Sequence, residues 1–129
     1  MKAKELRLGN LIYVKYDGIN PQTKIRKVSL ATISEVTRDG NDISYKPIPL
    51  IEEWLLKFGF KKASQQDSSY SRLSVNLDNY HILEYSKIDN CVHITNTQDC
   101  YYNIETSAEY VHQLQNLYFA LMGEELIIK

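Results

Sequence analysis

Cys91 and His93 are the residues whose types and spacing come nearest to a catalytic arrangement. A thiol nucleophile needs a neighbouring base to take its proton, and imidazole is a common base in this role. The two residues stand two apart in a short apolar run that is typical of a strand, so both side chains point to one face. The pair fits a small cysteine-dependent hydrolase, but two neighbouring sheet residues without chemistry are the simpler interpretation.

The remaining residues that could take part in chemistry form no recognisable catalytic or metal-binding pattern. His81 is expected at the surface of a strand, and His112 belongs to the polar face of a helix, where it suits hydrogen bonding. The carboxylates are scattered, and no nucleotide-binding, zinc-protease or serine-hydrolase motif occurs. Two cysteines and three separated histidines also lack the spacing of a zinc site. We therefore expect a protein that is not an enzyme, with no catalytic residue, no metal and no cofactor.

Charge is divided unevenly along the chain, although the net charge is only −1. Residues 1–46 hold nine Lys and Arg against five Asp and Glu, and the remainder is acidic. A basic segment with interleaved aromatic rings can contact nucleotides, although a mixed solvated surface is the simpler interpretation. The chain also has ten tyrosines, and tyrosine suits both β-sheets and binding surfaces. On this basis the candidate ligand-binding residues are Arg26, Lys27, Arg38, Tyr101 and Tyr102.

The length and composition predict a single domain over residues 1–129. The chain is 43% hydrophobic and 24% charged, which is ordinary for a folded protein with one core. No stretch approaches the roughly 20 apolar residues of a membrane-spanning helix, and the charged start does not resemble a secretory signal. We therefore expect a cytoplasmic protein with no membrane partner, in which the cysteines are reduced.

Hydrophobic periodicity indicates the elements that must position these residues. Residues 1–50 are expected to form a β unit, with strands over Asn10–Gly18 and Ile25–Val36, because these runs alternate or are rich in β-branched residues. A short helix is expected over residues 51–59, ended by Gly59 in the left-handed conformation.

Residues 70–105 are expected to form a β meander, because short alternating runs follow one another with turn residues between them. The fold class that results is α+β. It combines a small antiparallel sheet, either SH3-like or a meander, with one short middle helix and one long C-terminal helix.

The C-terminal helix is expected over residues 107–122, starting at a capping box in Thr106-Ser107-Ala108-Glu109. Its unusual feature is that no residue between Tyr110 and Gly123 carries a formal charge. One face is apolar, and the opposite face is either solvated, covered by the protein's own chain with its amides hydrogen-bonded, or covered by another subunit. The last possibility predicts a homo-oligomer whose interface residues are His112, Gln115, Asn116 and Phe119.

Three blocks carry a resemblance: KELRLGNLIYV, YKPIPLIEEWLLKFGF and YVHQLQNLYFALMGEELIIK. Together the blocks resemble a family of small uncharacterised proteins in phages and prophages of gut bacteria. The chain departs from the usual pattern at Ile51 and Met122, where members usually carry Thr, and Ile51 cannot cap the short helix. The resemblance implies a phage setting and the host-cell cytoplasm, but it brings no activity, cofactor or catalytic residue.

The function expected from these features is binding. The first hypothesis is a non-enzymatic phage accessory protein in the host cytoplasm, which serves counter-defence by sequestering a nucleotide signal or masking a host protein. The second is a nucleic-acid-binding module on the basic β unit, for which the proposed residues are Lys15, Tyr16, Lys24, Arg26 and Lys27. The third is a virion structural component that oligomerises through its last helix.

Overall fold

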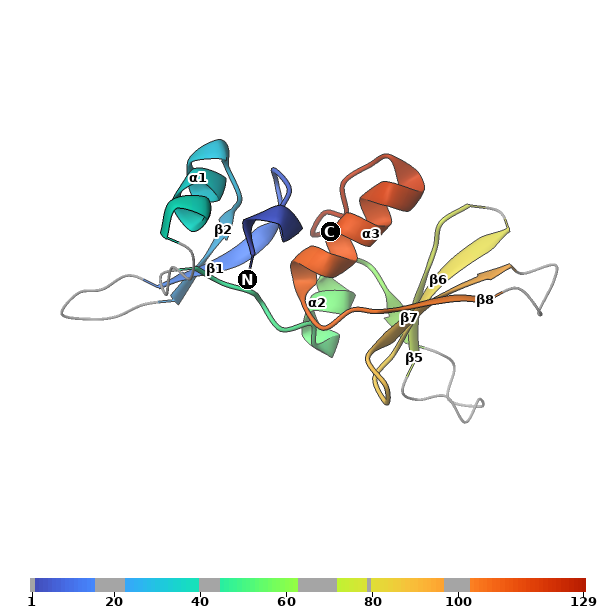
Figure 1. The fold of residues 1–129 in the computed structure, drawn as a ribbon. Helices are drawn as coiled ribbons and strands as arrows, with labels where there is room; N and C mark the ends of the chain where they lie inside the picture. The colour runs from blue at the N-terminus through green and yellow to red at the C-terminus, as the bar shows by residue number, and fades with distance from the viewer. Residues whose placement is uncertain (1, 16–22, 40–44, 63–71, 79, 97–102) are drawn as a thin grey trace. The chain divides into compact units, whose positions relative to one another are not determined.

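The computed structural model describes residues 2–15, 23–39, 45–62, 72–78, 80–96 and 103–129, which form two antiparallel sheets and three α-helices (Figure 1). The α+β fold class is therefore confirmed. In chain order the elements are η1 (Ala3–Glu5), β1 (Leu11–Lys15), β2 (Thr23–Lys27), α1 (Leu30–Asp39), β3 (Tyr45–Lys46), α2 (Glu52–Lys57), β4 (Lys61–Lys62), β5 (Arg72–Asn76), β6 (His81–Ser86), β7 (Cys91–Asn96), β8 (Asn103–Ser107) and α3 (Val111–Met122).

These elements fall into two compact units. The first unit consists of residues 1–49 and 110–125, and the second of residues 50–109 and 126–129. The chain therefore leaves the first unit after β3 and returns to it with α3. The single-domain organisation over residues 1–129 stays a prediction.

The first unit is built on a three-stranded sheet with the order β2-β1-β3. Ile12 and Val14 of β1 are buried in one apolar cluster with Val36 of α1 and Tyr45 of β3. Helix α1 therefore covers the face of the sheet that carries Ile12 and Val14. The apolar alternation of β1 was visible in the sequence, and its register with β2 pairs Ile12 with Arg26.

Helix α1 corrects the strand predicted over Ile25–Val36, because β2 ends at Lys27 and a helix begins at Leu30. Ser29 and Thr32 cap the helix start: the Thr32 N–H donates to Ser29 Oγ at 3.3 Å, and the Ser29 N–H donates to Thr32 Oγ1 at 3.3 Å. Thr32 and Val36 are both buried, and their spacing of four places them on one face of the helix. Packing of this face thus overrides the β propensity of the run.

Helix α3 begins four residues later than predicted. Thr106 and Ser107 belong to β8, where they pair with Val92 and Cys91 of β7. The residues of the expected capping box therefore form part of a strand and do not cap the helix. At the actual helix start the Tyr110 N–H donates to the side-chain oxygen of Gln113 at 3.2 Å. The helix ends at Met122, and Gly123 follows in the left-handed conformation with φ 69°.

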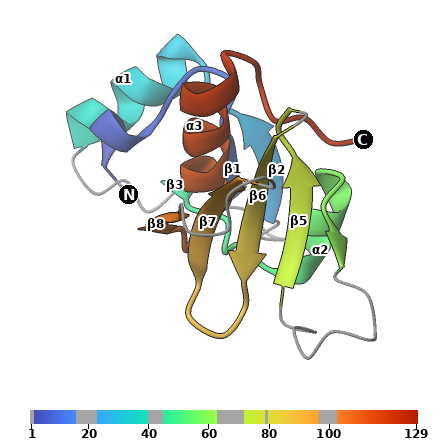
Figure 2. The same ribbon diagram turned by 90° about the vertical axis from the view of Figure 1, so that its right-hand side faces the viewer.

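The second unit contains the short helix α2 and a five-stranded sheet with the order β4-β5-β6-β7-β8. Its consecutive antiparallel neighbours are those of a meander, and Figure 2 shows β5, β6 and β7 side by side. Leu83 at the centre of the sheet is fully buried between Val75 and Ile94 on the adjacent strands. Gly59 follows α2 with φ 89°, as expected for a residue that ends a helix in the left-handed region.

Candidate nucleic-acid interface

The sheet face of the first unit that points away from α1 carries a group of lysines around a tyrosine. Ile12 and Val14 are buried against α1, so the alternation of β1 places Tyr13 and Lys15 on the opposite face. The register sets Tyr13 directly between Ile25 of β2 and Lys46 of β3. Residues directly opposite each other share a face of the sheet.

Lys27 joins this face because it pairs with Leu11, two residues from Tyr13 on β1. We call this surface the basic face, and define it by Tyr13, Lys15, Ile25, Lys27 and Lys46. Its three lysines are exposed, Ile25 is 48% exposed and Tyr13 is half-buried. The surface therefore offers three ammonium groups around a partly accessible aromatic ring and an aliphatic side chain.

The charges on this sheet have one sign. Every charged residue of β1, β2 and β3 is basic, since the strands read LIYVK, TKIRK and YK. Lysine on edge strands such as β2 and β3 also protects a sheet from pairing with other chains, so the pattern has a structural explanation as well. An anionic ligand with flat rings could place its negative charges beside the three lysines and stack one ring on the tyrosine.

The predicted ligand-binding residues do not converge on one site. Lys27 lies on the basic face, whereas Arg26 pairs with buried Ile12 and so belongs to the face covered by α1. Arg38 is exposed in the last turn of α1. Tyr101 and Tyr102 lie outside the described residues.

The second predicted set, for nucleic acid, is divided in the same way. Lys15 and Lys27 share the basic face, whereas Lys24 pairs with Val14 on the α1 side, as Arg26 does with Ile12. Tyr16 lies outside the described residues. Sequence reasoning missed Tyr13, Ile25 and Lys46, and only the register between β1 and its neighbours brings these three together.

The uncharged face of α3 binds the chain's own N-terminal segment. Gln115 Oε1 accepts the backbone N–H of Leu11 at 2.8 Å. Asn116 Oδ1 accepts from Arg7 Nη1 at 3.1 Å and from Asn10 Nδ2 at 3.0 Å, and Asn116 Nδ2 donates to the Glu5 carbonyl at 2.7 Å.

Three of the four predicted interface residues are therefore engaged within the first unit. Gln115 is buried and Asn116 half-buried by these contacts, and Phe119 lies under the guanidinium of Arg7. This is the arrangement expected if the protein's own chain covers the helix and hydrogen-bonds its amides. The homo-oligomer through α3 stays a prediction.

His112, the fourth residue of the predicted interface, is only 1% exposed. Its ring is stacked on Tyr110 with a centroid distance of 5.9 Å and an interplanar angle of 10°. Neither ring nitrogen has a hydrogen-bond partner among the residues that the structure describes, which corrects the hydrogen-bonding role expected from sequence. Burial lowers the pKa of His112, and the nearby Glu5 carboxylate opposes this effect.

The Cys91 and His93 pair stands on β7 with both side chains half-buried. His93 is opposite Glu84 on β6, and Cys91 is opposite Ser86. The Cys91 thiol donates to the backbone carbonyl of Asp89 at 3.4 Å. This weak hydrogen bond directs the thiol to the backbone of its own turn.

His81 lies against Asp78 at the surface, with Nδ1 2.9 Å from each carboxylate oxygen. The Tyr80 N–H, and after it the His81 side chain, lower the pKa of Asp78. In the described part of the chain, no three His, Cys, Asp or Glu side chains are grouped as metal ligands would be. Nor does any helix among these residues combine the length and apolarity needed to cross a bilayer.

Compared with protein-family models, with curated proteins and with solved structures, the chain shows no match to any of them.

Proposed function

We propose that the first unit binds single-stranded nucleic acid on the basic face. The observation that carries the proposal is the register that sets Tyr13 between Ile25 and Lys46, with Lys15 and Lys27 on the same face. Lysine ammonium groups attract phosphates, and release of the counterions from the nucleic acid supplies much of the affinity.

A single strand suits this surface better than a duplex. Bases can stack on an aromatic ring only after leaving their own stack, and each base stacked on an aromatic side chain contributes about 1–3 kcal/mol. Ile25, exposed beside the tyrosine, extends the apolar platform by one strand. The ligand expected is therefore a short, flexible strand whose phosphates follow the lysines and one of whose bases covers Tyr13.

The test is fluorescence anisotropy of a labelled oligothymidylate, titrated with the protein at salt concentrations between about 50 and 200 mM. Three phosphate contacts predict a slope of log K against log salt of about −2 for a single strand, and removing one lysine should reduce it by about 0.7. Lys27→Ala and Lys46→Ala should each weaken binding. Lys61→Ala removes an exposed lysine from β4 in the second unit and serves as the matched control.

The proposal fails if the oligonucleotide does not bind, or if Lys61→Ala weakens binding as much as Lys27→Ala. The first result would leave the lysines as protection of the sheet edges. The second would indicate attraction to the whole protein, with no defined site.

The resemblance to phage proteins supplies a setting for this binding, and we extend the proposal to a non-enzymatic accessory role in the cytoplasm of an infected host. Counter-defence by sequestering a nucleotide signal would use the same lysines. Competition distinguishes the two ligands: a mononucleotide that displaces the oligonucleotide at equal concentration supports sequestration. Displacement only by longer strands supports nucleic-acid binding.

A further inference from the structure

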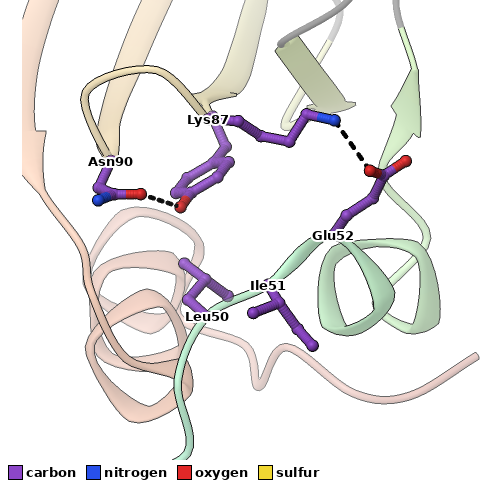
Figure 3. A pocket seen from close by; sticks show the side chains of 6 residues that line it. Leu50, Ile51, Glu52, Lys87 and Asn90 are labelled. Carbon is purple, nitrogen blue, oxygen red and sulfur yellow. Dashed lines mark hydrogen bonds and ion pairs between the residues drawn. The ribbon is translucent and has the colours of Figure 1, made fainter.

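A cavity of about 260 Å³ lies within the second unit, beside the start of α2 (Figure 3). It is lined by Leu50, Ile51, Glu52, Tyr85, Lys87 and Asn90. In Figure 3 Leu50 and Ile51 lie on one side of it, and Lys87 and Asn90 on the other. This volume is below the range of roughly 300–1,000 Å³ that is usual for sites of drug-sized ligands, so the occupant must be small.

The apolar part of the lining can hold the body of a ligand. Tyr85 is 2% exposed and Leu50 is 6% exposed, so both present fixed surfaces. Ile51, in contrast, is 49% exposed. A ligand with an aliphatic or aromatic body would remove the Ile51 side chain from water, which is favourable.

The charged part of the lining is Glu52 and Lys87, and a second ammonium group, that of Lys62, pairs with Glu52 from outside the lining. Lys87 Nζ lies 2.8 Å from Glu52 Oε2, and Lys62 Nζ lies 2.6 Å from Glu52 Oε1. The hydrogen bonds from Lys62 and then Lys87 lower the pKa of Glu52 to about 2. Glu52 is thus charged at neutral pH, and Lys62 can balance it when Lys87 takes another partner.

Asn90 holds the Tyr85 hydroxyl at one end of the cavity. It has φ 53°, in the left-handed region that asparagine tolerates better than most residues. Its backbone carbonyl accepts the Ala108 N–H at 3.0 Å, and its Oδ1 accepts the Tyr85 hydroxyl at 2.9 Å. These contacts hold Asn90 and the Tyr85 hydroxyl in place at this end of the cavity.

We propose that this cavity binds a small amphipathic carboxylate, a site separate from the function proposed for the first unit. The apolar body of the ligand lies against Leu50, Ile51 and the Tyr85 ring. Its carboxylate accepts a hydrogen bond from Lys87 Nζ.

An anion is favoured over a cation because Glu52 already has two ammonium partners, so a ligand amine would add a third positive charge there. Asp89, in the same turn as Lys87, does not line the cavity. The side chain of Ser86, the largest cause, and the Cys91 N–H lower the pKa of Asp89 by hydrogen bonding to its carboxylate, so this negative charge is held within the turn.

The probe is 3-phenylpropionate, titrated into the ¹⁵N-labelled full chain and followed by two-dimensional NMR. We expect saturable shifts of the Tyr85, Lys87 and Asn90 amides with a Kd on the order of 1 mM, as fits a ligand of this size. The neutral amide and the amine of the same skeleton should bind at least about tenfold more weakly. Lys87→Met should weaken carboxylate binding by a similar factor, Lys87→Arg should retain part of it, and Lys61→Met should leave it unchanged.

Three outcomes would overturn the proposal: no saturable shift with 3-phenylpropionate, an equal response to the neutral amide, or unchanged binding by Lys87→Met. A spectrum of Lys87→Met that keeps the dispersion of the parent protein shows that the variant is folded. If that variant does not fold, the comparison of carboxylate, amide and amine on the parent protein decides the question alone.

Discussion

The guanidinium of Arg7 lies 3.8 Å from the centroid of the Phe119 ring. The same group donates from Nη1 to Asn116 at 3.1 Å and pairs through Nη2 with Glu125 at 2.5 Å. The Arg7 side chain, near the start of the chain, therefore contacts three residues of the C-terminal segment. Two uncharged polar residues of α3, Gln115 and Asn116, are likewise hydrogen-bonded to the N-terminal segment, so this face needs no charged side chain to meet it.

Replacing Arg7 should destabilise the first unit. Arg7→Ala removes the contact with Phe119 and the donor to Asn116, and we expect a loss of about 1–2 kcal/mol in the free energy of unfolding. Arg7→Lys should recover less than half of this loss, because an ammonium cannot reach both acceptors as a planar fork does. Urea unfolding followed by circular dichroism measures both.

Lys4→Ala is the control for Arg7, since it removes an exposed cation from η1, three residues away. It should change the free energy of unfolding by less than about 0.5 kcal/mol. Equal stability of Arg7→Lys and the parent protein would contradict the role given to the guanidinium.

His112 should make the first unit less stable in mild acid. Burial favours the neutral imidazole, so the pKa of His112 in the folded state lies below its ordinary value of 6.5. Below about pH 6.5 the unfolded chain therefore binds more protons at this residue than the folded chain does, and the free energy of unfolding falls as the pH falls. Above that pH both states are neutral there and the effect vanishes.

The measurement is urea unfolding at several pH values between 5 and 7.5, for the parent protein and for His112→Phe. The variant should have a flatter profile in this interval, because its ring cannot be protonated. His81→Phe, at the exposed pair with Asp78, is the matched control. A His112→Phe profile as steep as that of the parent protein would refute the assignment.

The sequence predicted those elements that local pattern decides. The alternation in β1, the apolar spacing in α2 and the left-handed glycine after it all depend on residues within one element. Helix α1 was missed because its β-branched residues favour a strand, and only their burial against Ile12 and Val14 selects the helix. Helix α3 begins later than predicted because Thr106 and Ser107 pair with β7 as part of a strand.

The candidate sites depend on contacts that sequence does not encode locally. Asn116 and Asn10 are 106 residues apart, so the partner of the α3 face could not be identified from periodicity. The basic face needs the pairing of Tyr13 with Lys46, which are separated by β2 and α1. Asn90 takes its place at the cavity through the Tyr85 hydroxyl, a contact that a strand pattern cannot reveal.

The cap of α1 can be tested directly. Ser29→Ala removes the oxygen that accepts the Thr32 N–H, and we expect a loss of about 1 kcal/mol in the free energy of unfolding. Ser34→Ala makes the same substitution at an exposed position inside α1 and is the control. It should be neutral or slightly stabilising, because alanine has the higher helix propensity. Equal losses in both variants would mean that Ser29 is not the cap.

Substitutions at Tyr13 can distinguish the contribution of base stacking from that of charge to binding on the basic face. Tyr13→Leu keeps an apolar side chain between Ile25 and Lys46 but removes the aromatic ring, so oligonucleotide affinity should fall by about 1–3 kcal/mol with an unchanged salt slope. Tyr13→Phe keeps the ring and should bind nearly as well as the parent protein. Anisotropy titrations at two salt concentrations measure both quantities. If Tyr13→Leu binds as tightly as Tyr13→Phe, the lysines act through charge alone and the ring has only a packing role in the sheet.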